Sequence, residues 1–192
     1  CMLCDAKMRK EILSRLSGYR LEHTLGCERA AVMLAKRFGG DEEKCAFAAI
    51  LHDITKRLSR EEQLYLCENY GIIPCDVEKM EWKMLHGKTA AAIAEKEYHA
   101  PADIVHAIAV HTTGCANMTL LDKIIYLADF IEETRDFKGV EPARALARQD
   151  IDQALLYCFD FSLTDLVERG KLIHKDTFEA RNWLIWQGVP RA

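Results

Sequence analysis

The sequence predicts an all-α, single-domain protein, and three observations support this. Apolar residues recur at three- and four-residue spacing along most of the chain, and no segment alternates convincingly with a period of two. A length of 192 residues suits one domain with a substantial core. Hydrophobic residues make up 49% and charged residues 29%, a balance typical of globular proteins. We therefore expect residues 1–192 to form one helical domain.

Start and stop signals divide the first half of the chain into helices. Gly39-Gly40 should end one helix, and Asp41 should cap the next. Ser59-Arg60-Glu61-Glu62 has the pattern of a capping box, in which the first and fourth side chains cap each other's backbone. The predicted helices span about 5–17, 21–38 and 42–51, followed by one that opens at the capping box and ends before 71–74.

The second half is equally helical. Pro101 should open one helix, and Thr119-Leu120-Leu121-Asp122 forms a second capping box before an apolar helix. Arg135 to Pro142 should be a loop. The predicted helices span about 86–98, 101–110, 119–131, 142–168 with an interruption near Asp150 left open, and 175–186.

Charge and hydropathy exclude some partners. A net charge of -4 gives no support for general nucleic-acid binding, which normally uses a basic stripe. No uncharged apolar run approaches the roughly 20 residues of a membrane helix. No signal peptide is recognisable after Cys1-Met2-Leu3-Cys4, so we expect a cytoplasmic protein without a membrane partner. Cys1 before Met2 is unusual for a native start, and a cloning remnant or a longer chain remains an alternative.

The eight cysteines do not suggest a structural zinc site. Cys1 and Cys4 form a CxxC pair, but no second CxxC accompanies it. The other six are scattered, several of them among Ala, Leu and Ile, where a free thiol behaves as a small hydrophobe. We expect all eight to be reduced thiols.

Four metal-binding side chains occur in an order that suggests one site. His23 lies near a helix start, His52-Asp53 follows an apolar helix, and Asp129 lies within another apolar helix. A buried carboxylate is costly without a positive partner, and one cation would satisfy both aspartates. The alternative is that Asp53 caps a helix and Asp129 meets a buried arginine. The ordered set favours the cation.

This order resembles the H…HD…D signature of the HD-domain metal-dependent phosphohydrolases. The similarity extends over about residues 23–140 and is closest to the YqeK-type HD proteins, which are bacterial symmetrical diadenosine tetraphosphate hydrolases that yield two ADP. Glu133-Thr134 replaces a Pro-containing turn found in many members. The segments that carry the similarity are Glu22–Thr24, Leu51–Lys56, Leu85–Gly87, Ile108–Gly114, Lys123–Glu132 and Arg135–Val140.

The resemblance implies an HD-domain helical bundle, with the metal and nucleotide site within about 20–140 and the helices of 142–187 completing the bundle. It implies a divalent metal, with iron expected and manganese, zinc or nickel as alternatives. A dinucleoside polyphosphate or another nucleotide is the implied partner. The implied metal ligands are His23, His52, Asp53 and Asp129. The implied nucleotide and phosphate contacts are His23, Lys56, His86, His111, Thr112, Thr113, Asp129 and Arg135.

The catalytic residues implied are Asp53, His86 and His111, of which the two histidines are ambiguous. They could ligate a second metal, donate to phosphate, or protonate the leaving group. His111 follows a helix end, where the helix dipole favours a cation. We favour phosphate contact or acid catalysis over second-metal ligation.

Other functions remain as alternatives. Another HD phosphohydrolase could act on a mononucleotide, a cyclic nucleotide or guanosine tetraphosphate, and a non-catalytic nucleotide-binding regulatory module could keep the fold. The presence of all four signature ligands disfavours that module. No HExxH or GxxxxGK[ST] motif occurs, which argues against a zinc protease and a P-loop enzyme. A homodimer is left open.

The remaining histidines and the terminal aromatic residues are given structural roles. We expect His99 at the surface, His106 in partly buried packing, and His174 in a structural or solvent-facing position. Near the C-terminus, three aromatic residues should form a stripe that covers the core, with a partner-binding face as the alternative. These residues are Phe178, Trp183 and Trp186.

Overall fold

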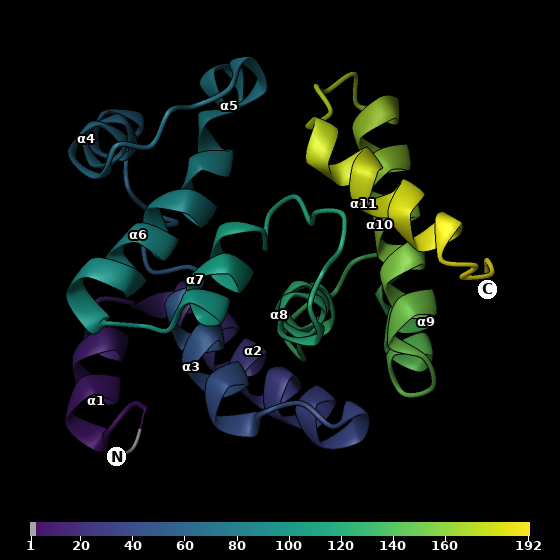
Figure 1. The fold of residues 1–192 in the computed structure, drawn as a ribbon, viewed down its shortest axis with the longest axis horizontal. Coiled ribbons are helices and arrows are strands. Elements are labelled where there is room, and N and C mark those ends of the chain that lie inside the picture. Colours follow the sequence, from purple (N-terminus) through teal and green to yellow (C-terminus); the bar gives the residue numbers. More distant parts are fainter. Residues whose placement is uncertain (1–2) are drawn as a thin grey trace.

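The computed structural model describes residues 3–192, which form eleven α-helices and one 3-10 helix without any strand (Figure 1). The expectation about Cys1 lies outside the described residues. The elements are α1 (Ala6–Ser14), α2 (Gly18–Phe38), α3 (Glu42–Leu51), α4 (Arg60–Tyr70), α5 (Asp76–Met80), η1 (Trp82–Leu85), α6 (His86–Tyr98), α7 (Ala102–Ala109), α8 (Leu120–Ile131), α9 (Val140–Ala147), α10 (Ile151–Glu168) and α11 (Lys175–Trp186).

Helix α8 lies at the centre of the bundle. It contacts α2, α3, α7, α9 and α10, and Figure 1 shows it between the α4–α6 side and the α9–α11 side. Ile124 and Leu127 of α8 and Phe159 of α10 are fully buried in one hydrophobic cluster. Burying such a side chain contributes about 1.5–3 kcal/mol. This apolar packing fixes the position of α8, and with it the position of any polar side chain that the helix directs into the interior.

The capping signals are confirmed. Asp41 accepts a hydrogen bond from the Lys44 backbone N–H, and α3 follows with the predicted bounds. Reciprocal capping boxes open α4 at Ser59 and α8 at Thr119. The all-α expectation is likewise confirmed for the described residues.

Several element boundaries were wrong. Pro142 does not end a loop but lies in the first turn of α9, where its missing N–H breaks no helical hydrogen bond. The interruption that the sequence left open near Asp150 is present: α9 ends at Ala147, and the Asp150 side chain accepts from two backbone N–H groups and caps α10. The short helices α5 and η1 were not predicted, because five- and four-residue helices carry little periodic signal.

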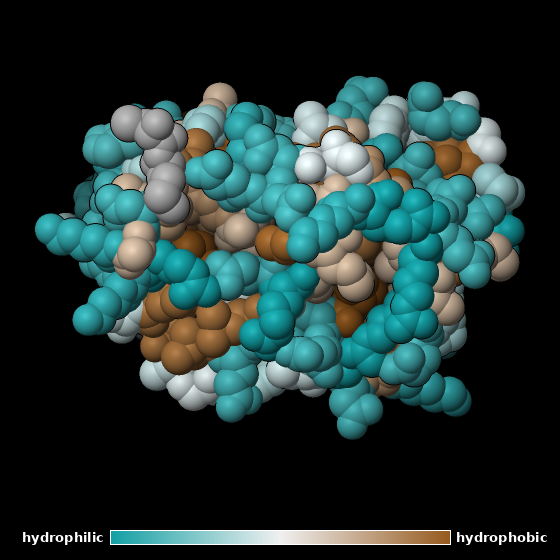
Figure 2. Space-filling view, turned by 90° about the horizontal axis from the view of Figure 1, so that it is seen from below, coloured by the Kyte–Doolittle hydropathy of each residue, from teal (hydrophilic) through white to brown (hydrophobic). Residues whose placement is uncertain are grey.

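Three predictions about single side chains also need correction. His106 is not a packing residue: its side chain is 51% exposed, and its Nδ1 contacts the buried Asp122 carboxylate at 2.9 Å. Phe178 and Trp186 do not cover the core, being 44% and 82% exposed, and only Trp183 packs against it. The face seen in Figure 2 is largely hydrophilic, with hydrophobic residues in separate patches. Within residues 3–192, no helix has the length and apolarity needed to cross a membrane.

Candidate metal and phosphate site

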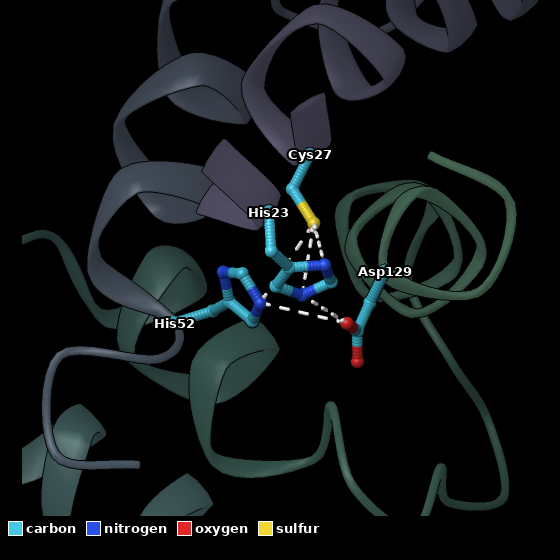
Figure 3. Close-up of side chains that lie close together, drawn as sticks. All are labelled: His23, Cys27, His52 and Asp129. Carbon is cyan, nitrogen blue, oxygen red and sulfur yellow. Dashed lines mark hydrogen bonds and ion pairs between the residues drawn. The ribbon is translucent and has the colours of Figure 1, made fainter. Parts of the chain in front are cut away.

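Three helices bring the four expected ligands together. His23 comes from α2, His52 follows α3, and Asp129 comes from α8 (Figure 3). Asp53 is the residue after His52. The His23 Nε2 lies 2.8 Å from Asp129 Oδ1, and the His52 Nε2 lies 3.6 Å from the same oxygen. Asp53 Oδ2 is 3.5 Å from both Nε2 atoms. Ligands bind a divalent cation at about 2.0–2.2 Å, so two ligands of one cation lie roughly 3–3.5 Å apart. The spacing fits one cation.

The surrounding backbone sets the tautomer of three histidines. Nδ1 of His52 donates to the Ala49 carbonyl at 2.5 Å. His86 and His111 donate in the same way to the carbonyls three residues before them, at 2.6 Å each. A carbonyl can only accept, so Nδ1 carries a proton in each ring, and in the neutral form of the ring the lone pair is on Nε2. This outer hydrogen bond is characteristic of metal-binding histidines.

Asp53 lies between two groups of histidines. Its Oδ2 faces His23 and His52, whereas its Oδ1 lies 3.3 Å from His86 Nε2 and 3.5 Å from His111 Nε2. The latter two nitrogens are 3.1 Å apart. Burial lowers the pKa of His86, with Asp53 opposing, which favours a neutral ring. Two lone pairs at this distance need a proton or a cation between them, so a second cation position beside Asp53 is chemically reasonable.

The carboxylates dominate the local electrostatics. Burial alone would raise the pKa of Asp53, but His52 and the other nearby histidines hold it well below its usual range. Burial likewise opposes ionisation of Asp129, and the hydrogen bonds from His23 and His52 lower its pKa well below normal. Burial would lower the pKa of His23, but Asp129 and Cys27 outweigh it and raise the value to about 10. A metal ion must displace the protons of these histidines in order to bind.

A cavity of about 400 Å³ opens over these groups, and several positively charged side chains line it. Arg20 Nη1 contacts Asp53 Oδ2 at 2.6 Å, and Arg135 Nη2 contacts Asp129 Oδ1 at 3.0 Å. Lys56 also lines the cavity, and burial lowers its pKa despite the neighbouring aspartates. Guanidinium groups suit phosphate oxygens. Positively charged side chains that can hold a phosphate chain therefore lie beside carboxylates that can hold a metal ion.

Only some of the other expected phosphate contacts line this cavity. His86, His111 and Thr112 line the cavity, but Thr113 does not. Its buried hydroxyl donates to the Gly114 carbonyl at 2.8 Å. Fully buried His23 and His52 lie outside the lining.

Sequence reasoning missed three residues around the site. Arg20 was unnoticed because nothing in its segment identifies which way it faces. Glu132 is buried, with Oε1 3.3 Å from His23 Nδ1, and a Cβ at Gly26 would overlap its carboxylate. Cys27 was treated as a small hydrophobe, although its Sγ lies 3.4 Å from His23 Nε2. One turn separates Cys27 from His23 on α2, and this spacing was an available signal.

The comparisons with known proteins agree with this geometry. Residues 20–134 match the HD domain, and the chain belongs to that family. A Bacillus subtilis protein named symmetrical bis(5'-nucleosyl)-tetraphosphatase is 35% identical, over 91% of this chain and 94% of the relative. A Staphylococcus aureus protein of the same name is 28% identical over 92% of each chain. Within the HD family, this chain therefore belongs with the proteins that carry this name, as the resemblance implied.

A solved structure supports the fold. A protein from Clostridium acetobutylicum, described as a predicted HD superfamily hydrolase involved in NAD metabolism, has a TM-score of 0.90 and is 38% identical. The match covers 94% of this chain and 96% of that one. The HD-domain helical bundle is confirmed.

Proposed function

We propose that this protein hydrolyses diadenosine tetraphosphate symmetrically, in a metal-dependent reaction that yields two ADP. The observation that carries the proposal is the convergence of His23, His52, Asp53 and Asp129 beneath a cavity lined with cations. Relatives named for this activity, matched over almost their whole length, support the choice of substrate.

The donor set fits a divalent metal, since its imidazole nitrogens and carboxylate oxygens are borderline and hard ligands. When bound, such a cation activates water and polarises a phosphoryl group. Arg20, Lys56 and Arg135 would hold and neutralise the phosphate oxygens as charge moves to the leaving group. Symmetrical cleavage requires attack at an inner phosphorus, with ADP leaving. Because ADP is a fair leaving group, His86 and His111 would assist by phosphate contact or proton donation.

Iron is the metal we propose, with manganese, zinc and nickel as alternatives. A second ion beside Asp53, His86 and His111 is included as an option, supported by the short separation of the two Nε2 atoms. A cytoplasmic location is also part of the proposal, and the free thiols among the described cysteines support it.

The direct test is to incubate the anaerobically prepared, iron-loaded protein with diadenosine tetraphosphate and separate the products. ADP alone is the expected result. AMP plus ATP would retain the metal site but contradict the assignment of the phosphate contacts. No turnover by the metal-loaded protein would overturn the proposed substrate, and a panel of deoxynucleotides, cyclic nucleotides and guanosine tetraphosphate would then follow.

A further inference from the structure

A second cavity adjoins the one over the metal ligands. It has a volume of about 430 Å³. The two cavities share four lining residues and therefore lie next to each other: Lys83, Met84, Thr112 and Tyr126. Its other side is formed by residues of α10 and the segment before α11, including Leu166 and Leu172. That side lies beyond the residues 20–134 that match the HD domain.

The lining suits a flat, partly apolar ligand with an anionic tail. Trp82 of η1 lines only this second cavity, as do Leu166 and Leu172. Lys83 belongs to both linings, and its Nζ lies 5.9 Å from the centroid of the Trp82 ring. Arg169 and Lys171 add positive charge on the far side. Aromatic side chains bind nucleobases by stacking, and lysines accommodate phosphates.

The size of the proposed substrate requires more than the first cavity. Pockets that enclose one drug-sized ligand measure about 300–1,000 Å³, and the first cavity lies near the lower end of that range. A dinucleoside tetraphosphate contains two nucleosides and four phosphates. Cleavage at its middle places one nucleoside diphosphate on each side of the attacked phosphorus. The two halves therefore need separate places that are joined at the phosphates.

We propose that the second cavity is a nucleoside subsite, which binds one adenosine of the substrate against Trp82 while its phosphates pass Lys83 into the metal-bearing cavity. This proposal rests on the proposed function for the identity of the ligand. It assigns the C-terminal helices a role in substrate selection, because they provide one wall of the subsite.

Fluorescence tests the location directly. The chain has three tryptophans, at positions 82, 183 and 186. In the Trp183→Phe, Trp186→Phe double variant, Trp82 is the only indole. Addition of the diadenosine tetraphosphate analogue with a central methylene bridge should quench and shift its emission. The matched control keeps Trp186 alone, whose side chain is 82% exposed and lines neither cavity, and should not respond.

Kinetics provides a second measurement. Trp82→Ala should raise KM for diadenosine tetraphosphate about tenfold or more, because loss of one base stack costs about 1–3 kcal/mol and each 1.4 kcal/mol is tenfold. The KM for adenosine tetraphosphate, which has one nucleoside, should rise less. The preference of the enzyme for the dinucleotide should therefore shrink. Trp186→Ala should leave the KM values for both substrates unchanged. If Trp82→Ala fails to fold, Leu166→Gln, which alters the opposite wall, replaces it.

The outcomes separate this proposal from the proposed function. Symmetrical hydrolysis by the wild type without a Trp82 response to the analogue would overturn the subsite alone. A Trp82 response to the analogue without any hydrolysis would support the subsite and overturn the proposed reaction. Absence of both would overturn both proposals. An equal rise in KM for the one- and two-nucleoside substrates would also contradict the subsite, since it would indicate a general defect.

Discussion

Two clusters of possible metal-binding side chains in this protein differ in their hydrogen bonding. The first is the site of His23, His52, Asp53 and Asp129. The second consists of Cys75, Glu78 and His174, with His174 Nε2 3.3 Å from Glu78 Oε1 and 3.5 Å from Cys75 Sγ. In both, a cation already pairs with a carboxylate, through Arg20 in the first and Lys88 in the second.

The difference lies in what the outer ring nitrogen does. At the first site, Nδ1 of His52 donates to a carbonyl, so once Nε2 loses its proton its lone pair can bind a metal. At the second, Nδ1 of His174 accepts from the Asp176 backbone N–H at 3.1 Å and caps α11. Its proton is therefore on Nε2, which donates to Glu78. Spacing alone would allow a metal at either cluster, but the outer hydrogen bond excludes His174 as a ligand while the cap is intact.

The largest effect should come from Asp53→Ala. Asp53 contacts both groups of histidines, so its loss should remove bound metal and lower turnover at least roughly a thousandfold. Metal content after dialysis and the rate of ADP formation measure the two effects. Asp76→Ala, at a fully exposed carboxylate, is the control and should change neither. Full activity in Asp53→Ala would contradict the assignment of the site.

Glu78→Ala should instead affect stability. The side chain is buried and accepts from Lys88 at 2.8 Å, so its loss should lower the free energy of unfolding by about 2 kcal/mol. Metal content should stay that of the wild type. Denaturant unfolding with metal analysis on the same samples is the measurement. Loss of metal from this variant would show that the second cluster also binds an ion.

The same carboxylate gives a pH dependence with a defined sign. Burial opposes ionisation of Glu78, but the hydrogen bond from Lys88 prevails and its pKa is lowered. The unfolded chain then binds the proton more readily than the folded one. The stabilisation is therefore present above the ordinary glutamate pKa and is lost as pH falls through the lowered value. Unfolding curves of Glu78→Gln should lack this acidic component, whereas an identical pH profile would argue against it.

Arg20→Ala should have a smaller and opposite effect on metal binding. Arg20 occupies the Asp53 oxygen that faces His23 and His52, so it competes with a cation there. Its removal should tighten Mn²⁺ binding about tenfold, the worth of one charged hydrogen bond, and should raise KM for the substrate because a phosphate contact is lost. Calorimetric titration measures the affinity. Arg29→Ala, at an exposed position on the same helix, is the control. Weaker metal binding in Arg20→Ala would indicate a purely structural role.

The comparison also shows what the sequence could predict. The His52-Asp53 pair after an apolar helix and the capping box at Thr119 are local sequence patterns. In the structure, α3 ends just before the first and α8 begins at the second, as predicted. The pairing of Glu78 with His174 joins residues 96 positions apart and depends on how α11 docks, which no local pattern records. Arg20 was missed for a related reason: it precedes the predicted helix of 21–38, and only the packed structure shows that it reaches across to Asp53.

The smallest expected effect is at Cys75, and it tests the comparison most sharply. Cys75→Ser removes the one thiol that could make the second cluster a zinc site, while a hydroxyl can still accept the proton of His174 Nε2. Zinc stoichiometry, stability and ADP formation should all remain at wild-type values. Because thiolate is a much better zinc ligand than a hydroxyl, even a weak site would lose zinc in this variant. An unchanged stoichiometry would support the conclusion that the outer hydrogen bond of a histidine, rather than proximity, distinguishes the two clusters.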